Sequence, residues 1–304
     1  YNNLIPAAAD IYSESSDLIV KSDLMLEMSG QRIIPDEGNG WNFTALRDIN
    51  FYLQYSHNCT DVNARNRYDG VARFFRAYFY FEKVKRYGDI PWYDKALDSD
   101  DPDLYKARDS REFVMQKMLA DLDFAITHLP KTKNAYILTR WTALALKSRV
   151  CLFEGTFRKY HGLEDYEKYL DACISASETF MNESGYTLYK SGSTPYRDLF
   201  ASMNLQADEI IFGRDYVASL SVLHNVQNYE NATTMGRPGL NKKIVNSYLM
   251  ADGSRFTDKA GYETMTFDQE CQNRDPRLAQ TIRTPGYTRI GSTKKEAPNL
   301  AYTM

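Results

Sequence analysis

The chain has 304 residues, of which 43% are hydrophobic and 25% charged, and its formal net charge is −3 at pH 7. This length and apolar content can fill a sizeable core, as one large domain or two ordinary ones, so disorder is not the expected state. Lysine and arginine are spread along the sequence without clustering, which gives no electrostatic basis for binding nucleic acid or an anionic membrane.

Helical periodicity begins near the start of the chain. Apolar residues spaced three and four apart predict helices over residues 7–27 and 41–57, which we expect to form an antiparallel pair. Three glycines and a proline between 29 and 40 predict a loop that separates them.

The stretch from Val71 to Trp92 is the element around which we expect the fold to be organised. An aromatic ridge recurs along it at helical steps, formed by Val71, Phe74, Phe75, Tyr78, Phe79 and Glu82. Basic residues such as Arg76 fall mostly on other faces. Gly88 can take a positive φ and Pro91 forbids further helix, so the pattern predicts a buried helix that stops sharply after Tyr87.

Further helices follow an acidic segment over residues 94–108. That segment lacks the central glycine and terminal glutamate of an EF-hand, so a solvated connection is favoured over a calcium loop. Ser110 is expected to cap a helix to about Leu129, and Thr139 a helix over residues 140–160. Another pair starts at Asp165. This succession predicts degenerate tetratricopeptide-like helix pairs.

The character of the sequence changes beyond Gly185. Two short runs, Tyr186–Tyr189 and Glu209–Phe212, are typical of strands, and glycine, serine, asparagine and proline are dense around them. A brief helix is expected over Asn241–Met250, followed by a turn at Asp252. The predicted fold is therefore mainly α, with helix-pair repeats over residues 1–185 and an irregular, loop-rich part over 186–304.

Patterns of known chemistry are absent from the sequence. The four histidines are not at metal-ligand spacing to one another, the four cysteines form no C-x-x-C pair, and no nucleophile or phosphate-loop motif is present. The sequence contains no run of 18 apolar residues, so it predicts no membrane-spanning helix. We therefore predict no catalytic residue, no metal and no cofactor, although a pair of carboxylates acting on a glycosidic bond leaves no sequence pattern.

Aromatic residues in loops are the informative feature. An aromatic ring in a loop, where no helical spacing assigns it to a core, can stack on the C–H face of a sugar. Polar neighbours can then bind the hydroxyls of that sugar. We expect Trp41 and Tyr287 to be stacking platforms. Their expected hydrogen-bonding neighbours are Asp36, Asn39, Asn228 and Arg289.

Several segments resemble, in order, the landmarks of the SusD/RagB family. These are YGDIPW (87–92), RWTALALKSRVCLFEG (140–155), YRDLF (196–200), DEIIF (208–212), YLMADG (248–253) and NRDPRL (273–278). Members of this family are cell-surface lipoproteins of Bacteroidetes, built on tetratricopeptide-like helix pairs, that bind glycans and cover a TonB-dependent transporter. The resemblance implies a single SusD-like domain over residues 1–304.

The resemblance also sets expectations for the rest of the protein. Family members carry a lipidated cysteine after the leader and a further helical stretch near the C-terminus; neither is seen, so we expect the sequence to be incomplete at both ends. The implied function is non-catalytic binding of an oligosaccharide and its delivery to a SusC-like transporter. The implied location is the extracellular face of the outer membrane, held by a lipid anchor that is absent from this sequence.

Three other functions are compatible with the same residues. The architecture could bind peptides or another nutrient, it could be a glycoside hydrolase with a helical body, or it could be a repeat scaffold for protein partners. Calorimetry with glycans and peptides, release of reducing ends and co-purification of a transporter distinguish them.

Overall fold

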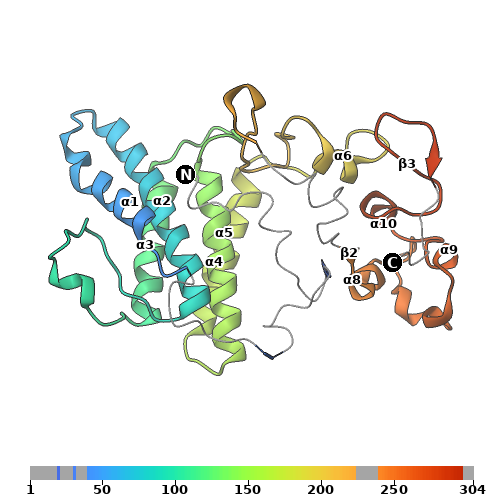
Figure 1. The fold of residues 1–304 in the computed structure, drawn as a ribbon, viewed down its shortest axis with the longest axis horizontal. Coiled ribbons are helices and arrows are strands. Elements are labelled where there is room, and N and C mark those ends of the chain that lie inside the picture. Colours follow the sequence, from blue (N-terminus) through green and yellow to red (C-terminus); the bar gives the residue numbers. More distant parts are fainter. Residues whose placement is uncertain (1–18, 21–29, 32–39, 224–238, 297–304) are drawn as a thin grey trace. The chain divides into compact units, whose positions relative to one another are not determined.

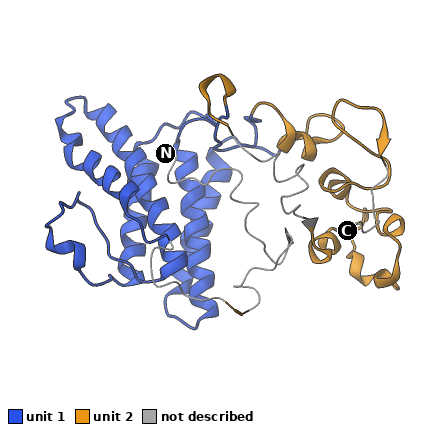
Figure 2. Ribbon diagram, viewed as in Figure 1, with its two compact units in different colours: residues 1–5, 35–188, 205–216 blue, residues 6–34, 189–204, 217–304 orange. Residues whose placement is uncertain are grey.

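The computed structural model describes residues 19–20, 30–31, 40–223 and 239–296. The chain divides into two compact units (Figure 2). Unit 1 comprises residues 1–5, 35–188 and 205–216, and unit 2 comprises 6–34, 189–204 and 217–304. None of the helices in the described ranges has both the length and the apolar character needed to cross a bilayer.

Unit 1 is a succession of α-helices in which each packs on the next (Figure 1). Its helices are α1 (Thr44–Tyr55), α2 (Val62–Tyr87), α3 (Arg111–His128), α4 (Arg140–Tyr160) and α5 (Tyr166–Glu183), with short 3-10 turns η2 (Ser56–Asn58) and η3 (Pro102–Tyr105). The most extensive contacts join α2 to α3 and α4 to α5. The prediction of a mainly helical fold made of helix pairs is confirmed.

The long helices begin at side-chain caps, because the first N–H groups of a helix have no partner within it. The Ser110 side chain accepts a hydrogen bond from the Phe113 N–H, and the Thr139 hydroxyl does the same for Thr142, as predicted. α2 is capped by Asp61, which accepts from two backbone N–H groups, and therefore begins well before Val71. It ends, as predicted, at Gly88, whose φ of 71° suits glycine.

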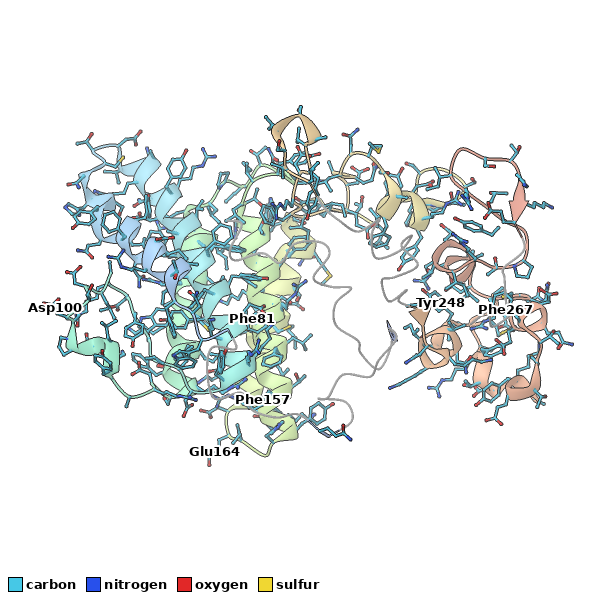
Figure 3. All side chains as sticks on the ribbon, viewed as in Figure 1. Phe81, Asp100, Phe157, Glu164, Tyr248 and Phe267 are labelled. Carbon is cyan, nitrogen blue, oxygen red and sulfur yellow. The ribbon has the colours of Figure 1, made fainter. Side chains whose placement is uncertain are left out.

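α2 is buried on more faces than its aromatic ridge predicts. Phe74, Phe75 and Phe79 are buried as expected, but Glu82 is exposed and Tyr80 is completely buried. The reason is that α2 contacts three other helices, α1, α3 and α4, so no single stripe defines its core face. Figure 3 shows the Phe81 side chain among the helices of unit 1, where its ring meets Phe153 edge-on at 5.5 Å.

The burial of Arg76 contradicts the prediction that the basic residues of α2 lie away from its buried faces. It is only 6% exposed, and its guanidinium donates to both oxygens of Asp121 on α3, at 2.6 and 2.8 Å. A third hydrogen bond of 3.2 Å reaches the Asn50 side chain on α1. A buried charge needs a partner, and this guanidinium connects three helices through its partners.

α4 carries a second buried charge cluster. Glu154 is fully buried and accepts from Arg158 at 2.7 Å and from the Nε of Arg111 at 2.8 Å. The next residue, Gly155, lies so close to α5 that a Cβ there would stand 2.6 Å from the Leu170 side chain. The close α4–α5 packing therefore depends on a glycine at this position.

Glu112 on α3 supplies a test of this packing by pH. Burial disfavours its charged form, but hydrogen bonds from Lys168, Gln116 and Tyr169 and the charge of Arg158 outweigh burial and lower the pKa from 4.5 to about 2. A carboxylate with a depressed pKa stabilises the fold above its unfolded pKa and loses that contribution as the pH falls through the folded value.

We therefore expect the stability advantage of wild type over Glu112→Gln to be constant above about pH 5 and to shrink between pH 4.5 and about 2. Urea denaturation across this range measures it. Glu178→Gln, at an exposed position of α5, is the control and should follow the wild-type profile. A constant difference between wild type and Glu112→Gln at every pH would contradict the charge-based account.

Unit 2 contains short elements joined by turns. They are β1 (Ile19–Val20), α6 (Pro195–Ala201), η4 (Ala218–Leu220), β2 (Gly239–Leu240), α8 (Lys242–Ser247), η5 (Phe256–Asp258), η6 (Tyr262–Thr264), α9 (Phe267–Glu270), α10 (Pro276–Thr281), β3 (Tyr287–Thr288) and β4 (Lys295–Glu296). β1 pairs with β2, and β3 with β4, both antiparallel. The irregular second half of the chain is thus as predicted, and α8 lies within the predicted helix 241–250.

One arginine organises the C-terminal part of unit 2. Arg274 is 7% exposed, and its guanidinium donates to the carbonyl oxygens of Val245 and Tyr248 at 2.7 and 2.8 Å. It also lies 3.9 Å from the centre of the Phe256 ring. The segments NRDPRL and YLMADG, separated in sequence, therefore belong to one structural cluster.

Two predictions about secondary structure are wrong where the structure describes them. Ile19–Val20 form a strand, whereas a helix was expected over 7–27; the rest of that range lies outside the described residues. The runs 186–189 and 209–212 form no strands. The Thr187 N–H donates to the carbonyl of Asp208, the residue before the second run, at 2.9 Å, but no ladder follows among the described residues.

Candidate functional site

The segment over residues 91–108, here called the 91–108 loop, is fixed at its base. The Ile90 N–H donates to the Asp109 carbonyl at 3.2 Å, and the Trp92 N–H to the Asp109 carboxylate at 2.7 Å. The Tyr80 hydroxyl accepts from the Tyr93 N–H at 2.6 Å, and the Trp92 ring stacks on Tyr80 at 4.2 Å. The exit from α2 is therefore a rigid base for a projecting loop, not only a helix stop.

Two side chains of α1 donate hydrogen bonds to backbone carbonyls in the first part of this loop. The buried amide of Asn50 donates to the Tyr93 carbonyl at 2.8 Å and to the Lys95 carbonyl at 3.2 Å. The Arg47 Nε donates to the Leu97 carbonyl at 3.3 Å. Because Asn50 also accepts from Arg76, the buried α2–α3 ion pair indirectly positions the loop.

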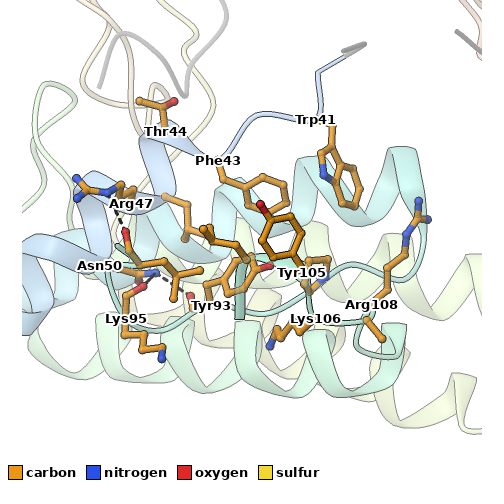
Figure 4. A pocket seen from close by; sticks show the side chains of 15 residues that line it. Trp41, Phe43, Thr44, Arg47, Asn50, Tyr93, Lys95, Tyr105, Lys106 and Arg108 are labelled. Atoms are coloured by element: carbon orange, nitrogen blue, oxygen red, sulfur yellow. Dashed lines mark hydrogen bonds between the residues drawn. The ribbon is translucent and has the colours of Figure 1, made fainter. Parts of the chain in front are cut away.

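A pocket of about 600 Å³ lies between the start of α1 and the 91–108 loop (Figure 4). We call it the α1 pocket. Its floor includes the fully buried Leu46, and its walls carry four aromatic rings and several polar side chains. The aromatic and polar residues that line it are Trp41, Phe43, Thr44, Arg47, Asn50, Tyr93, Lys95, Tyr105, Lys106 and Arg108.

Two of the rings are open to solvent. Tyr105 is 89% exposed, and Trp41 is 39% exposed although its edge meets Tyr87 at 4.9 Å and Phe43 at 5.3 Å. Singly exposed rings are common on protein surfaces, so these two rings are informative because they line the same pocket. These contacts hold the Trp41 ring in place, whereas Tyr105 projects from the short turn η3.

Tyr93 is the half-buried aromatic group of the pocket. Its hydroxyl donates to the Asp103 carbonyl at 3.0 Å. Burial raises the pKa of Tyr93, and the nearby carboxylates of Asp103, Asp109 and Asp101 raise it further. Both effects favour the neutral phenol, whose hydroxyl is engaged by the Asp103 carbonyl.

The pocket offers stacking surfaces and hydrogen-bond donors. Its lining contains no carboxylate, histidine or cysteine among the described residues. Within the same described ranges, no group of three or more histidine, cysteine, aspartate or glutamate side chains is arranged to hold a metal ion.

The six residues predicted to form a site fall in different places. Trp41 lines the α1 pocket in unit 1. Tyr287 and Arg289 belong to the β3–β4 region of unit 2, where Arg289 pairs with Glu296 at 2.7 Å and the Arg283 guanidinium lies 5.5 Å from the Tyr287 ring. Asp36, Asn39 and Asn228 lie outside the described residues.

The structure adds pocket residues that the sequence did not single out. Tyr105 stands in an acidic segment that we interpreted as a solvated connection, and Asn50 lies within the predicted helix 41–57, where it was not singled out as a site residue. A tyrosine directly after Pro102-Asp103-Leu104, outside any helical period, satisfied the same criterion that selected Trp41. Applied consistently, that criterion would have found Tyr105.

Two family models match the chain. One, described as starch-binding associating with outer membrane, matches residues 36–140, and the other, described as the SusD family, matches residues 175–303. SusD-like protein P2 of Formosa agariphila is 29% identical over 177 residues, covering 57% of this chain and 32% of that protein. SusD-like protein P38 of the same organism is 26% identical over 134 residues, covering 44% and 24%. The chain thus spans a third or less of these relatives.

Solved structures share the fold. A SusD-like protein from Bacteroides fragilis NCTC 9343 has a TM-score of 0.59 at 24% identity, covering 77% of this chain and 46% of that one. A SusD-like carbohydrate-binding protein from the same strain has a TM-score of 0.61 at 17% identity, covering 85% and 48%. A protein solved with xylogluco-oligosaccharide has a TM-score of 0.54 at 18% identity, covering 69% and 43%.

Proposed function

Because the chain belongs to the SusD/RagB family, we propose that it binds an oligosaccharide in the α1 pocket and carries out no chemistry on it. The observation that supports this proposal most strongly is the pair of solvent-open rings, Trp41 and Tyr105, beside polar side chains in one pocket. The sugar's C–H face covers a ring, and the polar groups bind its hydroxyls.

The pocket is also suited to binding by its rigidity. Asn50, Tyr80 and Asp109 fix the backbone of the 91–108 loop at three places, so little conformational entropy is lost when a ligand enters. Two relatives in fold add support, since one is described as carbohydrate-binding and another was solved with xylogluco-oligosaccharide.

The family match also suggests where the protein lies and what it does with its ligand. One of the two matching models is described as associating with the outer membrane. We propose that the protein lies at the extracellular face of that membrane, held by a lipid anchor outside this sequence, and delivers its ligand to a SusC-like TonB-dependent transporter. In this proposal the helix pairs face the transporter, and co-purification of the transporter with the tagged protein is the expected result.

Tyr105→Ala tests whether the pocket binds the glycan. Truncating an aromatic anchor typically costs about 2 kcal/mol or more, so we expect affinity for the oligosaccharide to fall about thirtyfold by isothermal titration calorimetry. Tyr160→Ala is the matched control, because Tyr160 is also 82% exposed but lies at the end of α4 and not in the pocket lining.

The same titrations distinguish the other functions. Equal loss of affinity in both tyrosine variants, or none in either, would contradict a binding role for the α1 pocket. Binding of a peptide mixture with no glycan binding would replace the ligand class. Release of reducing ends by the pure protein would establish a hydrolase instead.

A further inference from the structure

We infer that the oligosaccharide taken by the α1 pocket is acidic, carrying carboxylate or sulfate groups. This inference rests on the proposed function, since it names the ligand class of the same pocket. Its basis is the charge of the lining: all four charged side chains are cations, namely Arg47, Lys95, Lys106 and Arg108, and none of the described lining residues is an aspartate or glutamate.

The two lysines are already neutralised by the loop. Lys95 pairs with Asp101 at 3.1 Å and with Asp103 at 3.0 Å, and Lys106 pairs with Asp109 at 2.9 Å. These pairs close the loop on itself. The lysines therefore stabilise the pocket wall and are not the groups that attract a ligand's charge.

The two arginines are differently placed. Arg47 is exposed, and its Nε donates to the Leu97 carbonyl at 3.3 Å. Arg108 is exposed, and its guanidinium carbon lies 5.0 Å from the centre of the Trp41 ring. Among the described residues neither arginine forms an ion pair with a carboxylate.

Their positions suit a chain of sugar units. Figure 4 shows Arg47 and Arg108 at opposite ends of the pocket, with the rings of Phe43 and Tyr105 between them. A guanidinium binds carboxylate or sulfate oxygens through two parallel N–H groups. An oligosaccharide stacked along the rings would therefore place an acidic group at either end.

Acidic residues elsewhere in the loop do not cancel this arrangement. Asp94, Asp98 and Asp100 are exposed to solvent and absent from the pocket lining, so water and salt screen them from a bound ligand. The acidic ligand would then interact mainly with the arginines that it contacts directly. Its binding should weaken as salt rises, because the arginines themselves are exposed.

Pairs of oligosaccharides that differ in charge but share their sugar backbone test the inference by calorimetry on the full chain. The probes are oligogalacturonate with its fully methyl-esterified form, and a sulfated galactan oligosaccharide with its desulfated form. We expect at least one acidic member to bind about tenfold more tightly than its uncharged partner, with the preference reduced at high salt.

Single variants then identify the arginine that binds the acidic group of the oligosaccharide. Arg108→Gln and Arg47→Gln should each lower affinity for the acidic probe about threefold more than affinity for its uncharged partner, so that the tenfold preference shrinks in each variant. Arg67→Gln is the control, because Arg67 is an exposed arginine of α2 outside the pocket. It should change neither affinity.

The possible failures are distinguishable. Binding of uncharged members as tightly as acidic ones, with loss of affinity in Tyr105→Ala, would overturn the inference and leave the proposed function standing. A preference for acidic probes that Arg47→Gln and Arg108→Gln do not reduce would also overturn it. Absence of binding to every oligosaccharide would overturn both.

Discussion

Replacing Asp121 by alanine is expected to lower the free energy of unfolding by about 3–5 kcal/mol, the range for removing one partner of a buried ion pair. Asp121 is 2% exposed and is the partner of the buried Arg76 guanidinium. Without it, a charge between α2 and α3 has no compensation, and the link through Asn50 to the 91–108 loop is weakened. Chemical denaturation measures the loss.

The same helix supplies the control. Asp123 also pairs with a cation, Lys147, but its side chain is 57% exposed, so Asp123→Ala should cost less than about 1 kcal/mol. The double variant Arg76→Met, Asp121→Ala should be more stable than the sum of the single losses, because it no longer buries an unpaired charge. Equal losses in Asp121→Ala and Asp123→Ala would contradict the assignment of Asp121 to a buried network.

The double variant Trp41→Ala, Tyr105→Ala is expected to lower oligosaccharide affinity by a hundredfold or more, which is about 3 kcal/mol. The reason is that it removes both solvent-open rings of the α1 pocket. Calorimetry measures the affinity, and an unchanged circular dichroism spectrum would show that the fold is retained.

Tyr287→Ala is the informative comparison for this variant. Tyr287 was expected to be a stacking platform together with Trp41, and it lies in unit 2 beside an Arg289 that is engaged with Glu296. If Tyr287→Ala lowers affinity as much as the double variant, the ligand also depends on unit 2. Wild-type affinity in Tyr287→Ala would leave the α1 pocket as the binding site.

Helices were predictable where local chemistry determines their ends. Ser110, Thr139 and Gly88 fix three helix boundaries through hydrogen bonds or backbone conformation within a few residues, so sequence alone located them. The burial of Arg76 was not predictable, because it depends on Asp121, which is 45 residues away along the chain.

The candidate site was predictable in kind and only partly in position. Trp41 could be selected because no helical period accounts for its ring. The pocket itself depends on the Asn50 side chain reaching two carbonyls across more than 40 residues of sequence, which no spacing rule reveals. Tyr105 meets the same loop-aromatic criterion as Trp41, but only that fold-back shows that the two rings line one pocket.

A crystal structure of the full chain with a bound oligosaccharide tests the central claim most directly. We expect electron density for sugar rings in the α1 pocket, in contact with Trp41 and Tyr105, while the Asn50 hydrogen bonds to the loop remain in place. Sugar density elsewhere in the chain, with the α1 pocket filled only by solvent, would contradict it.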